Sequence, residues 1–366
     1  MAEEEKIFSF RDWMAQNNRA YYSRAFPGKQ GDFITSPMAH PAFGGAIARQ
    51  LIEMDEKLGK PDPFSVYEFG AGTGQLSLNI LKTIKEESSD LFPRLSYGIS
   101  DFSEPASVIQ NRFQEEFPEG LNHICFSPYF GSDEFENPEI SSGCVLANEF
   151  LDALPVHLIV KRGGKYNEVF ILEKGGKVEI AEFPPLSEVL NFIESHQIDL
   201  PDGVFAEINL EMDHWIQWLS SSLKKGFALI IDYGGIKDEI RGEHKPEGTL
   251  RGFKHHRMAE VFNLQIGEGD WTSDIDFSIL ARLAQKRGLG IAGLATQGDF
   301  LLGLGLAERL PTFRKKELTI PDLKEHLGMK FLFHPEGLGN AFHVLGLHKG
   351  VSSPKLAGFS VRRLEL

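Results

Sequence analysis

A glycine-rich turn between a strand-like and a helix-like segment is the feature that most constrains the fold. Residues 64–69 (FSVYEF) are β-branched and aromatic, and residues 70–74 (GAGTG) form the turn. Residues 75–87 then carry apolar side chains at helical spacing. Because further strand-like and helix-like segments alternate along the chain, the sequence predicts an α/β fold with a parallel sheet covered on both faces.

The alternation gives a set of expected elements. Further strands are expected at residues 94–100, 122–127, 143–148, 227–234, 289–296 and 341–347. Helices are expected at residues 9–26, 41–58, 104–117, 208–226, 272–288 and 298–310, with Gly59 and Gly226 as stop signals. Two Gly-Gly pairs between alternating runs predict a β-meander at residues 157–183, inserted into the sheet or flanking it.

Composition and charge limit the classes of partner. The net charge is −14, from 38 Lys and Arg against 52 Asp and Glu. This balance argues against a general nucleic-acid binder, although it leaves a basic peptide or protein open. Cys125 and Cys144 are too few for a disulfide framework and are expected as buried thiols in a reducing compartment. The acidic start (MAEEEKIFSF) and the lack of an 18-residue apolar run predict a cytoplasmic protein without a membrane span.

The spacing of the glycines narrows the choice of ligand. A glycine turn lets the backbone approach a ligand closely, although a tight turn without a ligand is the alternative. Gly70 and Gly72 fit the dinucleotide fingerprint, but Gln75 stands where that fingerprint needs Gly or Ala. No GK[ST] follows, which excludes a Walker phosphate loop. Asp101 closes the next strand, where a carboxylate can bind ribose hydroxyls or cap the following helix.

The segment E-F-G-A-G-T-G, followed one strand later by Asp101, resembles the first motif of class I S-adenosylmethionine-dependent methyltransferases. From about Tyr21 to Leu347 the chain also resembles the MidA-like family of these enzymes. The resemblance rests on an ordered set of segments: GDFITSP (31–37), NEFLDALP (148–155), IIDYG (230–234), GTL (248–250), GDWTSDIDFSILA (269–281) and TQGDFLLGLGL (296–306).

The resemblance implies a fold, a cofactor and a reaction. The implied fold is Rossmann-like, with a mostly parallel seven-stranded sheet, an N-terminal helical portion and a β-rich insertion. The implied cofactor is S-adenosylmethionine, and the implied reaction is methylation of a protein arginine. The mitochondrial member of the family assists assembly of respiratory complex I, so a respiratory-complex subunit is an expected protein partner.

The chain departs from the family pattern at three places. Its glycine loop reads Gly-Ala-Gly-Thr-Gly-Gln-Leu where the family has G-P-G-R-G-T-L, and Met38 stands where the family has Glu. Asp101 replaces a family Glu and keeps the acid. The first two changes leave two alternatives open: methylation of another acceptor, either a small molecule or a different side chain, or a cofactor-binding assembly factor without catalysis.

The expected cofactor site draws on two parts of the chain. We expect Glu68, Gly70, Gly72, Gly74 and Asp101 to hold the cofactor. The resemblance implies that residues 31–37 fold over the site, with lid contacts from Asp32, Thr35 and Ser36. Local turns made by the same polar side chains are the alternative for this second group.

Three polar residues at the end of an apolar strand are the expected catalytic group. Asn148, Glu149 and Asp152 follow residues 143–147, at the edge where open α/β sheets bind ligands. Because the arginine guanidinium stays charged, a carboxylate can grip its planar fork. Glu149 is the first candidate, Asp152 the second, and Asn148 can accept a hydrogen bond. Capping of the following turn is the alternative for Asn148 and Asp152.

Several other residues have simpler predicted roles. Asp232 ends residues 227–234 on the ligand edge, and Ser273 and Asp276 form a capping-box-like pair. His256 is a structural or polar site residue, and the histidines have no metal-site spacing. The predicted domains are an N-terminal helical and lid segment (1–59), a methyltransferase domain (60–350) with an insertion (about 157–206), and a tail (351–366).

Overall fold

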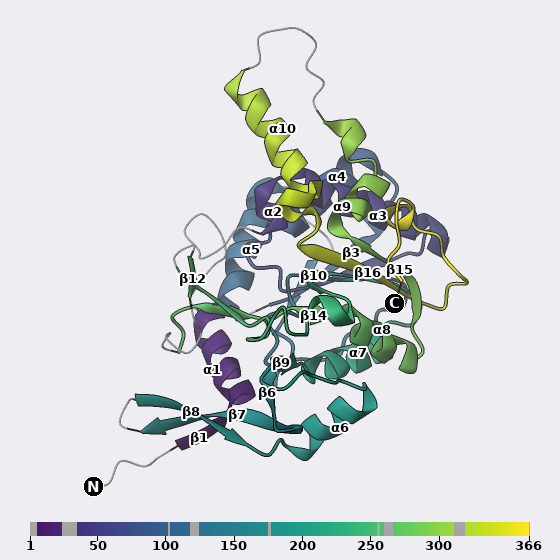
Figure 1. The fold of residues 1–366 in the computed structure, drawn as a ribbon. Helices are drawn as coiled ribbons and strands as arrows, with labels where there is room; N and C mark the ends of the chain where they lie inside the picture. The colour runs from purple at the N-terminus through teal and green to yellow at the C-terminus, as the bar shows by residue number, and fades with distance from the viewer. Residues whose placement is uncertain are drawn as a thin grey trace.

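The structure is a computed structural model that describes most of the 366 residues. The described residues are 6–23, 35–101, 103–117, 124–174, 177–254, 257–259, 266–310 and 319–365. Figure 1 shows a central sheet between helices, with a smaller sheet below it. Two expected site residues, Asp32 and His256, lie outside the described residues.

The central sheet confirms the predicted fold class. Its seven main strands run in the order β15-β16-β10-β5-β2-β3-β4, and a two-residue strand, β14, pairs with β10. Neighbours from β10 to β4 are parallel, whereas β16 is antiparallel to both β10 and β15. The strands are β2 (Phe64–Phe69), β3 (Leu95–Ser100), β4 (Ile124–Ser127), β5 (Gly143–Asn148), β10 (Gly226–Gly235), β14 (Ile275–Asp276), β15 (Gly290–Thr296) and β16 (Phe342–Lys349).

Both faces of the central sheet are buried because its strands are apolar on both sides. In β5, Cys144 and Leu146 pack into the core on one face, whereas Val145 and Ala147 pack into the core on the other. The first core includes α3 (Ala42–Leu58), α4 (Gln75–Glu87), α5 (Ser103–Glu116), α9 (Gln297–Gly303) and α10 (Ile320–Phe333). The second includes α6 (Ser187–Ser195), α7 (Glu211–Ser222) and α8 (Phe277–Lys286). No described helix has the length and apolar character needed to cross a membrane.

A second, antiparallel sheet contains the predicted meander. Its strands are β1 (Lys6–Ser9), β6 (His157–Arg162), β7 (Lys165–Lys174), β8 (Lys177–Phe183) and β9 (Phe205–Ile208). Gly163 and Gly164 both have positive φ in the two-residue turn between β6 and β7, as the Gly-Gly pair predicts. Strand β1 lies before the first predicted domain boundary but pairs with β7. The predicted domain bounds remain a prediction.

Helix α1 (Phe10–Tyr22) packs against this second sheet. Phe10 and Met14 share a core with Val169 and Ile171 of β7 and with Trp271. Ser9 begins the helix, and its hydroxyl accepts the Asp12 backbone N–H at 3.1 Å. Helix α1 therefore has a fixed position between the second sheet and the edge of the first.

The remaining elements are short. A small sheet has the order β12-β11-β13. It contains β11 (Arg251–Lys254), β12 (Arg257–Ala259) and β13 (Asp270–Thr272). The short helical turns are α2 (Ser36–Ala39), η1 (Phe92–Arg94), η2 (Lys237–Glu239), η4 (Ala307–Arg309), η5 (Pro335–Gly339) and η6 (Ala357–Phe359).

The predicted helix at residues 208–226 is wrong at both ends. Ile208 ends β9, and α7 spans only Glu211–Ser222. Gly226 does not stop the helix but begins β10, where an added Cβ would lie 2.0 Å from the Gly143 carbonyl oxygen. Helical spacing continues through this region, so the sequence pattern alone does not mark these ends.

The predicted helix at residues 272–288 begins later than expected. Thr272 ends β13, and α8 starts at Phe277. Asp276 is the N-cap itself, since its carboxylate accepts the Ile279 backbone N–H at 2.9 Å. The predicted capping box with Ser273 is therefore wrong, although Asp276 does cap the helix.

Gly143 offers a test of the contact between the two central strands. Its φ is +157°, and an added Cβ would lie 1.8 Å from the Ser65 carbonyl oxygen of β2. We expect Gly143→Ala to lower the free energy of unfolding by about 3 kcal/mol, because strain and overpacking act together. The measurement is urea unfolding at constant pH.

Gly163→Ala is the matched control for this substitution. Gly163 also has positive φ, at +56°, but no heavy atom of the described residues lies within 4 Å of its added Cβ. We expect Gly163→Ala to lower the free energy of unfolding by only about 1 kcal/mol, because only backbone strain acts there. Equal losses in the two variants would contradict the predicted clash between β2 and β5.

Candidate active site

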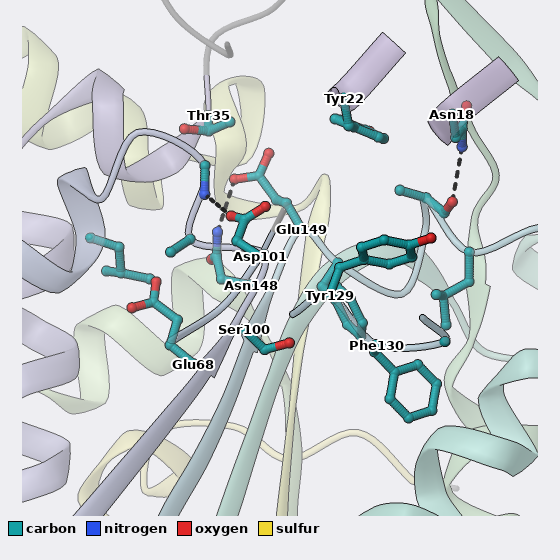
Figure 2. Close-up of a pocket in the computed structure, with 18 of the residues that line it drawn as sticks. Asn18, Tyr22, Thr35, Glu68, Ser100, Asp101, Tyr129, Phe130, Asn148 and Glu149 are labelled. Atoms are coloured by element: carbon teal, nitrogen blue, oxygen red, sulfur yellow. Dashed lines mark hydrogen bonds between the residues drawn. The ribbon is translucent and has the colours of Figure 1, made fainter. Parts of the chain in front are cut away.

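A cavity of about 280 Å³ lies at the carboxyl ends of β2, β3 and β5. Because these strands are parallel, the residues that follow them meet at one edge of the sheet. Figure 2 shows side chains from these strand ends together with side chains from α1. The polar lining residues include Arg11, Asn18, Arg19, Tyr22, Thr35, Glu68, Thr73, Gln75, Ser100, Asp101, Tyr129, Asn148, Glu149 and Glu211.

The glycine loop forms one wall of the cavity. Gly70, Gly72 and Gly74 have φ values of +66°, +57° and +70°, which glycine adopts without steric cost. Gly70 and Gly72 line the cavity, whereas Gly74 does not. Gly74 begins α4, and an added Cβ would lie 2.8 Å from Cγ2 of Ile109. It therefore serves close packing between α4 and α5.

Glu68 lies near the end of β2 with only 1% of its surface exposed. Its Oε2 accepts hydrogen bonds from the Ser77 hydroxyl at 2.6 Å and the Tyr97 hydroxyl at 2.7 Å. Burial raises the pKa of Glu68 to about 7, although the two hydrogen bonds oppose this shift. The carboxyl group is thus oriented by α4 and β3 before any ligand binds.

Asp101 follows β3 and contacts the glycine loop directly. Its Oδ2 accepts the Gly72 backbone N–H at 2.7 Å, as the dashed line in Figure 2 shows. The preceding Ser100 also lines the cavity and donates its hydroxyl hydrogen to the Pro128 carbonyl at 2.8 Å. Asp101, which follows β3, therefore fixes the glycine loop, which follows β2.

Asn148 ends β5, Glu149 follows it, and both face the same cavity. Oε1 of Glu149 accepts the Asn148 amide and the Ser36 backbone N–H, each at 3.2 Å. Two buried oxygens, Oδ1 of Asn148 and Oε2 of Glu149, have no hydrogen-bond partner among the described residues. Each such group costs about 1 to 3 kcal/mol unless a donor satisfies it. The pair is therefore suited to a ligand with several N–H groups.

The Glu149 carboxyl group lies in a low-dielectric, acidic environment. Burial raises the pKa of Glu149 to about 8, and the nearby Asp152 charge adds to the shift. Hydrogen bonds from Ser36 and Asn148 act in the opposite direction. A cation next to this carboxyl group would lower its pKa again and favour the ionised form.

Asp152 belongs to a buried acidic group behind the cavity. It does not line the cavity, and its side chain lies close to Asp232 and Asp270. Burial raises the pKa of Asp152 well above its usual range, and the Asp232 charge adds to this. Burial also raises the pKa of Asp232 to about 7, with Glu149 as the next cause.

Helix α1 forms the opposite wall of the cavity. Asn18 and Tyr22 lie across the cavity from Glu68 in Figure 2. The Asn18 amide donates to the Ala153 carbonyl at 2.9 Å and to the Trp271 carbonyl at 3.0 Å. This amide therefore ties α1 to the segment that follows Glu149.

Most of the predicted site residues are brought together. Glu68, Gly70, Gly72, Asp101, Thr35, Asn148 and Glu149 line one cavity. Gly74, Ser36 and Asp152 are not in its lining, for three separate reasons. Gly74 packs on α5, Ser36 reaches Glu149 only through its backbone N–H, and Asp152 turns into the buried acidic group.

The sequence reasoning missed several lining residues. Tyr129 and Phe130 follow β4 at the same sheet edge, so their position after a predicted parallel strand was an available signal. The contribution of α1 had no comparable signal, because Asn18 is 135 residues away from its partner Ala153. Contacts this distant in sequence depend on the three-dimensional fold.

Comparison with known proteins assigns the chain to a family. Residues 46–295 match the model of a family described as "Putative S-adenosyl-L-methionine-dependent methyltransferase". The chain is similar to the Drosophila melanogaster "Protein arginine methyltransferase NDUFAF7 homolog, mitochondrial", with 29% identity over 93% of this chain and 80% of that protein. It is 30% identical to the Homo sapiens "Protein arginine methyltransferase NDUFAF7, mitochondrial", over 89% of this chain and 76% of that protein.

A solved structure has the same fold. It is a Burkholderia thailandensis protein bound to S-adenosyl-homocysteine, with a TM-score of 0.80 and 24% identity. The alignment covers 97% of this chain and 90% of that one. At this identity the likeness shows the fold alone.

The comparisons also correct one expectation. A cytoplasmic location was expected, but the fly and human relatives are named as mitochondrial proteins, which contradicts it. The acidic N-terminal segment was therefore not a sound basis for assigning a compartment. The family match, by contrast, covers more than half of the chain and agrees with the glycine loop and the fold. The chain belongs to the MidA-like family of S-adenosylmethionine-dependent methyltransferases.

Proposed function

We propose that this chain transfers a methyl group from S-adenosylmethionine to an arginine side chain of a protein. The observation that carries the proposal is the pair of buried, unpartnered oxygens on Asn148 and Glu149. A guanidinium group has five N–H donors and no acceptor, so it can satisfy both oxygens. The names of the fly and human relatives support the same acceptor.

The residues around the glycine loop fit the cofactor. S-adenosylmethionine supplies an electrophilic methyl group on a positively charged sulfonium. We assign its binding to Glu68, Gly70, Gly72 and Asp101. The glycine backbone permits close approach, and acidic groups tolerate the positive charge. Tyr129, after β4, provides an aromatic surface at the same edge for the adenine ring.

Glu149 would hold the acceptor and take up a proton. The ionised carboxylate can accept hydrogen bonds from the guanidinium and orient one nitrogen towards the methyl group. Transfer to a charged guanidinium releases one proton. Burial favours the neutral form of this carboxyl group by raising its pKa, so it can accept that proton more readily than a solvent-exposed Glu in the same position.

The identity of the acceptor can be tested by labelling. The protein is incubated with methyl-labelled S-adenosylmethionine and a lysate, and the labelled proteins are hydrolysed to amino acids. Labelled methylarginine supports the proposal, and a respiratory-complex subunit is the first purified acceptor to test. Label in another residue or in a small molecule would replace arginine as the acceptor. No label would favour an assembly factor without catalysis.

The first prediction from the site concerns Asp101. Asp101→Ala removes the contact to the Gly72 N–H and the proposed ribose acceptor. We expect the affinity for S-adenosylhomocysteine to fall by roughly 1 to 3 kcal/mol, about 5- to 150-fold. Isothermal titration calorimetry measures it, with the exposed Asp90→Ala as control. Unchanged affinity in Asp101→Ala would remove Asp101 from the cofactor site.

The second prediction concerns Glu149. Glu149→Gln keeps a side-chain oxygen for the Ser36 and Asn148 donors but removes the charge. We expect normal folding and nearly parental cofactor affinity, with methyl transfer reduced about a hundredfold, because a desolvated charged hydrogen bond is lost. Asp152→Asn should reduce methyl transfer less than Glu149→Gln does, since Asp152 does not line the cavity. Single-turnover transfer beside a thermal melt is the measurement; a parental rate in Glu149→Gln would refute the role.

The third prediction is the pH dependence of acceptor use. With the Glu149 pKa raised to about 8 in the free protein, the carboxyl group is mostly neutral at lower pH and must lose its proton to bind a cation. We expect kcat/KM for the acceptor to rise about tenfold per pH unit up to a break at or below pH 8. The sulfonium cation moves the break downwards, because it favours the carboxylate.

The matched control for this profile is Glu149→Gln, which has no group to titrate at this position. Its kcat/KM should be flat over the same pH range, with cofactor saturating at every pH. The same slope in the parent and in Glu149→Gln would show that another group causes the pH dependence.

A further inference from the structure

Asp232 contacts the backbone that carries Glu149, although it does not line the cavity. Its Oδ2 accepts three consecutive backbone N–H groups, from Phe150 at 3.2 Å, Leu151 at 2.9 Å and Asp152 at 3.3 Å. The Asp232 residue has no exposed surface. Successive N–H groups that converge on one oxygen form an anion-binding concavity in the backbone.

The backbone at Glu149 needs such support. Its φ is +51°, in the left-handed region that non-glycine residues rarely adopt. Its own N–H donates to the Ile231 carbonyl of β10 at 2.9 Å, which continues the pairing of β5 with β10. The next three N–H groups then leave that pairing and turn to Asp232. Consecutive residues of β10 thus hold both sides of the turn at Glu149.

We infer that Asp232 is a positioning residue for methyl transfer, because it holds the turn that directs Glu149 into the cavity. The inference rests on the proposed role of Glu149. Without Asp232, three backbone N–H groups would lose their shared acceptor, and the left-handed turn would lose its support. A charged acceptor makes stronger hydrogen bonds than a neutral one, so Asn at this position should retain part of the effect.

The first experiment tests the turn without any activity measurement. Amide hydrogen exchange is followed at Phe150, Leu151 and Asp152 in the parent, in Asp232→Ala and in Asp232→Asn. We expect exchange at these three amides to be at least tenfold faster in Asp232→Ala, with a smaller change in Asp232→Asn. Unchanged exchange in both variants would overturn the inference. The Asn variant keeps the test decisive if the Ala variant does not fold.

Glu168→Gln is the matched control for the loss of a buried carboxylate. Glu168 is also fully buried and accepts a backbone N–H, from Leu186 at 2.9 Å, but it lies in the second sheet. We expect this control to lower the overall stability without a selective change at residues 150–152. If the control accelerates exchange at these amides equally, the effect is global and the inference is wrong.

The second experiment is a double-mutant cycle with Glu149→Gln. We expect Asp232→Asn to lower acceptor kcat/KM about tenfold while S-adenosylhomocysteine affinity stays within twofold of the parent. In the Glu149→Gln background, the same change should alter kcat/KM by less than twofold, because Asp232 acts through Glu149. An equal tenfold loss in both backgrounds would overturn the inference.

The two experiments separate this inference from the proposed function. The acceptor in the cycle is whichever one the labelling experiment identifies, so a failure of the arginine assignment does not stop the test. If no acceptor is labelled, the proposed function fails while hydrogen exchange still decides whether Asp232 holds the turn. If arginine is methylated but the cycle is additive, the proposed function stands and the positioning role fails.

Discussion

The parallel pairing of β5 with β2 on one side and with β10 on the other is the constraint on which the site depends. This pairing brings the glycine loop after β2, the Asn148–Glu149 pair and Asp232 to the same edge of the sheet. Gly143 permits it, because a side chain there would meet the backbone of β2. The chemistry at the edge is therefore set by strand register before any ligand binds.

Electrostatics at this edge opposes stability. Glu149, Asp152 and Asp232 are acids whose pKa values burial raises, and each adds to the repulsion felt by another. Apolar residues at these positions would give a more stable folded protein than the buried acids do. This loss of stability is consistent with a site whose ligands are cations: a sulfonium and, as proposed, a guanidinium. Such cations replace repulsion by attraction, so the site is most stable when it is filled.

The sequence predicted the elements whose bounds depend on local patterns. Its predictions were wrong where contacts between residues far apart in the sequence determine the structure. The strand Phe64–Phe69 and the helix Gln75–Glu87 have their predicted bounds, because a glycine turn marks the junction. The start of α7 was misplaced, because helical spacing runs on through the end of β9. Asp152 was expected beside Glu149, but the left-handed turn at Glu149 sends it into the protein instead. That turn depends on β10, about 80 residues further along the chain.

The position of α1 joins the two sheets in a single structural unit. The C-terminal half of the helix supplies Asn18 and Tyr22 to the cavity, and the N-terminal half packs Phe10 and Met14 on β7. Among the described residues, none from the second sheet lines the cavity. The second sheet thus supports α1, which forms one wall of the cavity, although the sheet does not line the cavity itself. Substitutions in the second sheet can therefore move α1 and change the shape of the cavity while every lining residue stays the same.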